Sequence, residues 1–188
     1  MSLVDTPDDY PYAWYIRPLL TLMRRRGGVV PEPVKLWARV PVAFFGFQLM
    51  LKVLERKRSP LDPKLRALVR TRIAQINHCH FCVDLNASHA LDRGVSEEQL
   101  RELAQYRNSS EFSETETAAL DYAEAITGTA IEIDPELTAR LRKSFNDDAI
   151  VELAALAAHQ NLSAKFNAAL QIPAEGFCLT AHRIKAPD

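Results

Sequence analysis

Glycine and cysteine are both scarce in this chain. Its 188 residues include 6 glycines and 3 cysteines. Few glycines, and few stretches in which apolar and polar residues alternate, argue against a fold rich in short strands and tight turns. Three cysteines are too few, and an odd number, for a small secreted scaffold held together by disulfides.

Net charge and long hydrophobic runs are lacking too. Lysine and arginine total 23 against 24 acidic residues, so the formal charge of -1 gives no overall field that favours nucleic acid. The most apolar stretch, residues 40–51, is too short to cross a bilayer. Residues 1–15 are acidic and aromatic, unlike a signal peptide. We therefore expect a cytoplasmic protein with no nucleic-acid partner and no membrane contact.

Helix boundary signals are abundant. Asp62-Pro63 and Asp134-Pro135 place a capping carboxylate before a first-turn proline, and Ser96 and Ser113 open capping boxes. The sequence predicts an irregular arm, a short connector, a C-terminal tail that is extended or packed as an arm, and a series of helices. The arm covers residues 1–13, the connector 29–33 and the tail 172–188, and the helices cover 13–26, 41–56, 63–76, 79–94, 96–106, 113–127, 134–145 and 146–170.

We therefore predict an all-α fold, a compact helical bundle. Hydrophobic residues make up 47% of the chain, which is enough for a core without disulfide staples. Residues 1–58 are expected to form an N-terminal arm and helices. Residues 59–188 are expected to form the helical core, folding as one domain with the N-terminal part.

The chemistry is expected at Cys79 and Cys82, a C-x-x-C pair at the predicted start of a helix. Two thiols at this spacing can close and open a disulfide. A helix N-terminus lowers the pKa of a cysteine through its free N–H groups and its dipole. His78 precedes the pair and His80 lies between the two cysteines, and both are candidates for adding positive charge or moving protons.

Helical geometry adds two residues to the candidate site. Asn86 and His89 follow Cys82 by four and seven positions and project from the same face. Asn86 is close enough to contact the sulfur. His89 lies roughly 10 Å further along the axis, so it would need a water molecule or a bend to act on the thiol.

Other interpretations of these residues remain open. The two cysteines could be small buried apolar residues, or His78, Cys79, Cys82 and His89 could bind zinc. A structural zinc site needs four ligands in a tetrahedral array, and the chain has no second C-x-x-C, so we expect no metal and no cofactor. Two further candidates, His159 in an apolar helix and Cys178 near the C-terminus, are interpreted as packed core residues.

The stretch from Leu61 to His89, LDPKLRALVRTRIAQINHCHFCVDLNASH, resembles the carboxymuconolactone decarboxylase and alkylhydroperoxidase D superfamily. The resemblance covers about residues 60–105, and segments 112–127 and 161–170 also fit. It implies an all-α fold, a homo-oligomer and a thiol-dependent peroxidase-like activity. In that family Cys82 corresponds to the peroxidatic cysteine, which forms the sulfenic acid, and Cys79 to the partner that closes the disulfide.

The resemblance fails at two positions that transfer protons in the family. The family's glutamate falls on Ala67 and its histidine on Asn86, and neither residue can act as an acid or base. Three interpretations follow. The relay is rebuilt from His78, His80, His89 or Asp84; the protein performs disulfide exchange, which needs less proton transfer; or the activity is weak or directed at another substrate.

The expected function is therefore a peroxidase that reduces a small hydroperoxide and is itself reduced by an external dithiol or reductase partner. The alternatives are a disulfide reductase using the same pair, or a non-catalytic oligomeric binding protein. Lactone decarboxylation is the least favoured enzyme activity, because that branch of the superfamily does not depend on a C-x-x-C.

Overall fold

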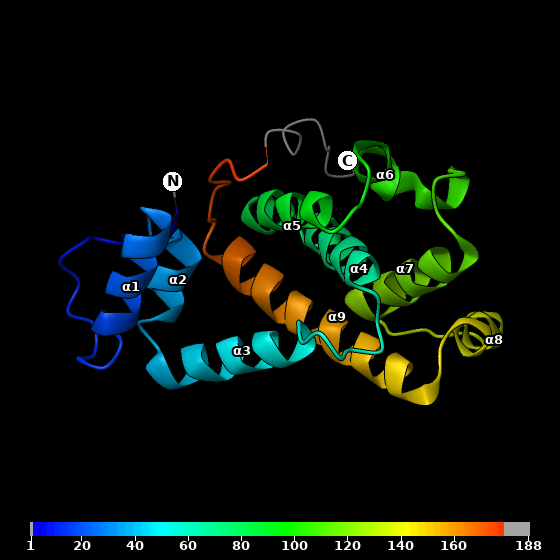
Figure 1. Cartoon of the computed structure of the whole chain (residues 1–188), viewed down its shortest axis with the longest axis horizontal. Helices are drawn as coiled ribbons and strands as arrows, with labels where there is room; N and C mark the ends of the chain where they lie inside the picture. Colours follow the sequence, from blue (N-terminus) through cyan, green and yellow to red (C-terminus); the bar gives the residue numbers. More distant parts are fainter. Residues whose placement is uncertain (1, 179–188) are drawn as a thin grey trace.

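The computed structural model describes residues 2–178, and the secondary structure within that range is helical (Figure 1). This confirms the predicted all-α fold. In chain order the elements are α1 (Arg17–Gly27), α2 (Glu32–Trp37), α3 (Pro41–Leu54), α4 (Pro63–Ile76), α5 (His80–Asp92), α6 (Glu97–Glu102), the 3₁₀-helix η1 (Leu103–Asn108), α7 (Glu114–Thr127), α8 (Pro135–Ser144) and α9 (Asp147–Ala169).

The predicted caps form as expected. The Asp62 side chain accepts hydrogen bonds from the first turn of α4. Ser96 pairs with Gln99 at the start of α6, and Ser113 pairs with Glu116 at the start of α7, both as reciprocal capping boxes. Each cap satisfies main-chain N–H groups that a helix start otherwise leaves without partners, which explains why these boundaries could be located from sequence.

Helix α4 is the centre of the bundle, because it packs against α5, α7 and α9. Its apolar side chains Leu65, Leu68, Val69 and Ile73 join one large buried cluster. In Figure 1, α9 runs diagonally across the molecule past α4 and α5, and α3 lies along its other side. The candidate cysteines sit at the turn between α4 and α5, next to the C-terminal end of α9.

The N-terminal elements α1 and α2 lie beside the C-terminal half of α9 (Figure 1). The Trp37 ring stacks on Phe166 with 4.0 Å between centroids, which joins α2 to α9. The prediction of a connector over residues 29–33 was wrong in part, since α2 begins at Glu32. This six-residue helix is held by burial of Leu36 and Trp37, a tertiary effect that local sequence does not reveal.

Helix α3 carries an exposed apolar stripe. Val42, Phe45, Leu49 and Val53 are 83%, 45%, 65% and 50% exposed, and they recur at helical spacing on one side. Such a surface suits contact with another protein chain. The homo-oligomer stays a prediction. Within residues 2–178, no helix has both the length and the apolar character needed to cross a bilayer.

Candidate functional site

The turn between α4 and α5 positions the first cysteine. Helix α4 ends in a Schellman motif, in which His78 N–H donates to Gln75 O and Cys79 N–H donates to Ala74 O, both at 3.0 Å. His78 occupies the left-handed position of this motif with φ 50, where glycine is usual. The motif fixes the backbone of Cys79 before α5 begins.

Cys79 and Cys82 form a disulfide across the first turn of α5, with their Cα atoms 5.2 Å apart. Cys79 is the N-cap residue, and its Sγ accepts a hydrogen bond from Cys82 N–H at 3.2 Å. The sulfur thus takes the place of the oxygen in an ordinary N-cap. Both residues are buried, at 1% and 3% exposure.

Asn167, in the last turn of α9, contacts the second sulfur. Its Nδ2 donates to Cys82 Sγ at 3.2 Å, and the side chain is buried at 2% exposure. Asn86, which we expected near the sulfur, instead donates to the main-chain oxygen of Arg70 at 3.3 Å. Asn167 was missed because 85 residues separate it from Cys82, and no local pattern marks the contact.

A second Schellman motif ends α9 close to the same site. Gln171 N–H donates to Ala168 O, and Ile172 N–H donates to Asn167 O. Gln171 takes the left-handed position with φ 54. Within residues 2–178, His78 and Gln171 are the non-glycine residues with positive φ. Both helix ends that flank the disulfide therefore carry the same uncommon backbone feature.

Asp84 holds the segment that follows α9. Its carboxylate is buried and accepts four main-chain N–H groups, from Glu175, Gly176, Phe177 and Cys178, at 2.7 to 3.1 Å. These bonds occupy both carboxylate oxygens. Asp84 therefore anchors residues 175–178, a role its sequence position did not suggest. The remainder of the predicted tail, 179–188, lies outside the described residues.

The three candidate histidines lie on the surface. His78 and His80 flank Cys79 and are exposed, and His89 is exposed at the far end of α5. Desolvation lowers the pKa of His89, and the positive charges of Arg93 and Arg70 lower it further. The hydrogen bonds found at the two sulfurs come from Cys82 N–H and Asn167. A catalytic role for the histidines stays a prediction.

An apolar layer covers the disulfide. The side chains packed around it come from α2, α4, α5, α9 and the residues after α9, and they include Leu36, Ala74, Phe81, Ala164 and Ile172. The N-terminal arm completes the layer, since Val4 packs on the cluster and Leu3 N–H donates to Leu170 O at 2.8 Å. A reagent reaching either sulfur must displace part of this cover.

A partly buried ionic network lies where α4 meets the end of α3, and Arg66 is its buried member. Glu55 Oε1 is 2.6 Å from Arg70, and its Oε2 is 2.8 Å from Arg93 and 3.8 Å from Arg66. Arg70 also donates to Gln160 on α9 at 3.0 Å. Burial lowers the pKa of Arg70, and Glu55 opposes that shift. The network has no local sequence signal, because α4 supplies Arg66 and Arg70 while Glu55 and Arg93 follow the ends of α3 and α5.

The two isolated candidates are both buried, as expected. Cys178 is 3% exposed and belongs to the main core cluster. His159 stacks on Phe47 and its Nε2 lies 3.2 Å from Phe47 O, while its Nδ1 has no hydrogen-bond partner. Burial lowers the pKa of His159. Within residues 2–178, no three His, Cys, Asp or Glu side chains are grouped so as to hold a metal ion.

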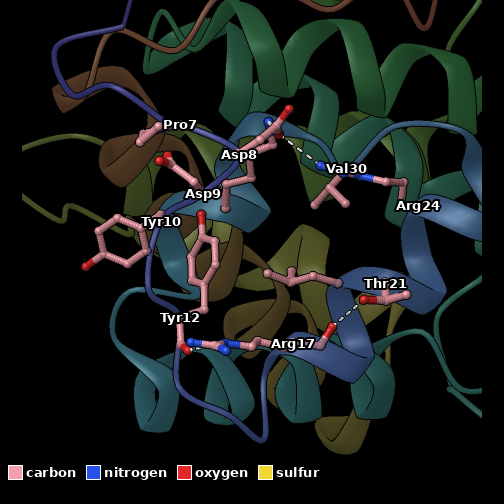
Figure 2. A pocket seen from close by; sticks show the side chains of 11 residues that line it. Pro7, Asp8, Asp9, Tyr10, Tyr12, Arg17, Thr21, Arg24 and Val30 are labelled. Carbon is pink, nitrogen blue, oxygen red and sulfur yellow. Dashed lines mark hydrogen bonds and ion pairs between the residues drawn. The ribbon is translucent and has the colours of Figure 1, made fainter.

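A separate pocket of about 440 Å³ lies between the arm, α1 and α2 (Figure 2). Several of its polar groups bind one another, while the buried Tyr12 hydroxyl has no hydrogen-bond partner within the described part of the chain. Asp8 pairs with Arg24 at 2.9 Å and with Lys35 at 3.5 Å, and Arg17 donates to Tyr12 O at 2.9 Å. The charges of Lys35 and Arg24 lower the pKa of Asp8. These contacts fasten the arm that covers the disulfide, and no sequence pattern predicted them.

Comparison with known proteins places this site in a family. The model of the carboxymuconolactone decarboxylase family matches residues 44–125, a range that includes both cysteines. The uncharacterized protein YnjA of Escherichia coli (strain K12) is 45% identical over 163 residues, which cover 87% of this chain and 90% of YnjA.

Solved structures share the fold at lower identity. A peroxidase-related protein from Ralstonia eutropha JMP134, described as an alkylhydroperoxidase AhpD core, has a TM-score of 0.80 and 22% identity, with 98% of each chain covered. The debrominase Bmp8 has a TM-score of 0.78 and 19% identity, with 98% of this chain and 97% of Bmp8 covered. The chain thus belongs to the carboxymuconolactone decarboxylase family and has the AhpD-like fold.

Proposed function

We propose that this protein is a thiol-dependent peroxidase in which Cys82 attacks a small hydroperoxide and Cys79 resolves the product. The observation that carries the proposal is the closed Cys79–Cys82 pair at the start of α5, in a chain of this family. The homo-oligomer and the external reductant belong to the same proposal.

The proposed cycle has three steps. The Cys82 thiolate attacks the distal oxygen of ROOH, the O–O bond breaks, and the product is a sulfenic acid plus ROH once the alkoxide takes a proton. The Cys79 thiol then attacks the sulfenic sulfur, forms the disulfide and releases water. An external dithiol reduces the disulfide by thiol exchange and leaves as its own disulfide. Two electrons pass from the external dithiol to the peroxide.

Two features support the sulfur chemistry. A helix N-terminus favours a thiolate over a thiol, and both cysteines lie in the first turn of α5 or at its N-cap. The backbone on either side is fixed by the helix end and the helix start, so the two sulfurs are held within bonding range. Each sulfur also has an N–H donor.

The test is peroxide consumption by the reduced protein with an excess of a dithiol. Cumene hydroperoxide should disappear with the wild type, and Cys82→Ser should lose that activity. Cys79→Ser should accumulate a sulfenic acid at Cys82, detected with dimedone. Equal rates for wild type and Cys82→Ser would contradict the assignment of Cys82 as the attacking residue.

A second candidate, disulfide reduction by the same pair, is favoured by one observation. Ala67 and Asn86 stand at the family's proton-transfer positions, and Asn86 is bound to a main-chain oxygen. Thiol exchange needs less proton transfer than cleavage of an O–O bond. This candidate predicts turnover of a small model disulfide without consumption of hydroperoxide, and inertness in both assays would favour a non-catalytic binding protein.

A further inference from the structure

We infer that Asn167 is a positioning residue that directs thiolate character to Cys82 by donating its amide N–H to that sulfur. The inference rests on the proposed function for its meaning in catalysis. Its physical content, a lowered pKa of Cys82, can be measured without any peroxide.

The helix start alone favours the other cysteine. Cys79 is the N-cap, and its sulfur accepts the N–H of Cys82, the third residue of the helix. A thiolate at Cys79 would receive that hydrogen bond and the field of the helix dipole. Cys82 lies within the helix and needs a donor from another part of the chain. Asn167 supplies it at 3.2 Å from α9.

A packing role does not account for the Asn167 side chain. The residue is 2% exposed, yet its Oδ1 has no hydrogen-bond partner. A buried acceptor without a partner costs about 1 to 3 kcal/mol. An apolar side chain would avoid that cost among the apolar residues that surround the pair, such as Ala164 and Ile172. What the amide provides in return is one N–H group aimed at sulfur.

The end of α9 holds the amide in place. Asn167 O accepts the N–H of Ile172 in the Schellman motif, so the segment after α9 holds the main chain of Asn167 in place. Ile172 packs in the same cluster as both cysteines. A donor fixed before the charge develops stabilises a thiolate without reorganisation.

The charged groups on the neighbouring elements have other partners or lie on the surface. They include Glu32 and Lys35 on α2, bound to Ser2 and Asp8; Arg70 and Arg72 on α4, bound to Glu55 and Glu124; Asp84 on α5, bound to residues 175–178; Glu175 after α9, which accepts the Glu32 N–H; Lys165 on α9, exposed; and His78 and His80, exposed. The hydrophobic side chains clustered with the two cysteines include Leu36, Phe81 and Ile172. Among the contacts found at Cys82, the Asn167 amide is thus the polar group supplied by another helix.

The experiment uses the full chain with a single thiol left at the site. Cys79→Ser and Cys82→Ser backgrounds, each also carrying Cys178→Ala, are combined with Asn167, Asn167→Ala or Asn167→Asp. The thiolate is titrated by its ultraviolet absorbance and by the pH dependence of iodoacetamide alkylation. Asn167→Asp keeps the size of the side chain but replaces the donor with a negative acceptor. Leu162→Ala, at an exposed position of the same helix, is the control.

With Cys82 as the single thiol, we expect Asn167→Ala to raise its pKa and to lower the thiolate fraction near pH 7 by about threefold to tenfold, since one pKa unit is tenfold. Asn167→Asp should raise the pKa of Cys82 more than Asn167→Ala does. With Cys79 as the single thiol, Asn167→Ala should change the thiolate fraction by less than about twofold, because the Asn167 amide donates to Cys82 Sγ. Asn167→Asp should raise the pKa of Cys79 less than that of Cys82, because the new charge stands next to the Cys82 sulfur. Thermal unfolding identifies any variant that fails to fold.

Equal shifts at both cysteines, or none at Cys82 in the folded Asn167→Asp variant, would overturn the inference. A shift confined to Cys82 in a protein that consumes no hydroperoxide would uphold the role of Asn167 and reject the peroxidase. The two ideas can therefore fail separately.

Discussion

The carboxylate of Asp84 lies 2.7 Å from the main-chain nitrogen of Gly176, and it accepts three more N–H groups from the same segment. Asp84 is only two residues beyond Cys82. Asp84 and the second cysteine thus share one turn of α5. The residues just before the anchored segment 175–178, including Ile172, belong to the cover of the disulfide.

Replacing Asp84 should therefore affect both stability and access to sulfur. Hydrogen bonds to a charged group contribute about 1.5 to 3 kcal/mol each when measured singly, and Asp84→Ala should lower the free energy of unfolding by about 3 kcal/mol. Dithiothreitol should reduce the Cys79–Cys82 disulfide faster in this variant, because the cover is loosened. A stable variant with an unchanged rate of reduction would show that the tail does not protect the pair.

Glycine at the left-handed positions should stabilise the protein. A non-glycine residue in that conformation costs about 1 kcal/mol, so His78→Gly and Gln171→Gly should each raise the free energy of unfolding by up to that amount. His80→Gly, in the first turn of α5, is the control and should be destabilising. Peroxide consumption by His78→Gly also tests the predicted catalytic role of that imidazole.

Loss of Glu55 should be among the most damaging changes. Glu55→Ala leaves Arg66, Arg70 and Arg93 without their shared carboxylate, and an uncompensated buried charge costs about 3 to 5 kcal/mol. Urea denaturation would measure the loss. As a control, Glu114→Ala removes an exposed pair with Lys143 and should leave the urea midpoint nearly unchanged. Similar midpoints for the two variants would refute the importance of the network.

The buried His159 should make stability depend on pH. Its pKa is lower in the folded protein than in the unfolded chain, so below about pH 6.5 the unfolded chain binds more protons and stability falls as pH falls. His159→Gln can still donate to Phe47 O but does not titrate. When the pH is lowered from about 7.5 to 5.5, the variant should lose less stability than the wild type. His89→Gln should be added to both proteins, because the pKa of His89 is lowered as well.

Local signals predicted the helices well and the site only in part. The caps at Asp62, Ser96 and Ser113 act within one turn, so sequence located α4, α6 and α7 closely. The cysteine pair was also evident from spacing alone. Asn167 contacts Cys82 across 85 residues. Asp84 binds main-chain N–H groups more than 90 residues away, and such groups are the same whatever the side chain, so no residue type marks the contact. Helix α2 was missed because tertiary burial holds it.

The Schellman motif before Cys79 also governs what happens when the disulfide opens. The main-chain N–H of Cys79 is hydrogen-bonded to Ala74 O, and Cys82 belongs to α5. Reduction of the disulfide therefore frees few backbone torsions. The two thiols remain at a high effective concentration, and ring closure carries little entropic cost. A sulfenic acid formed on Cys82 would be captured by its neighbour before a second peroxide arrives, so the helix junction would guard the protein against irreversible sulfinic acid damage.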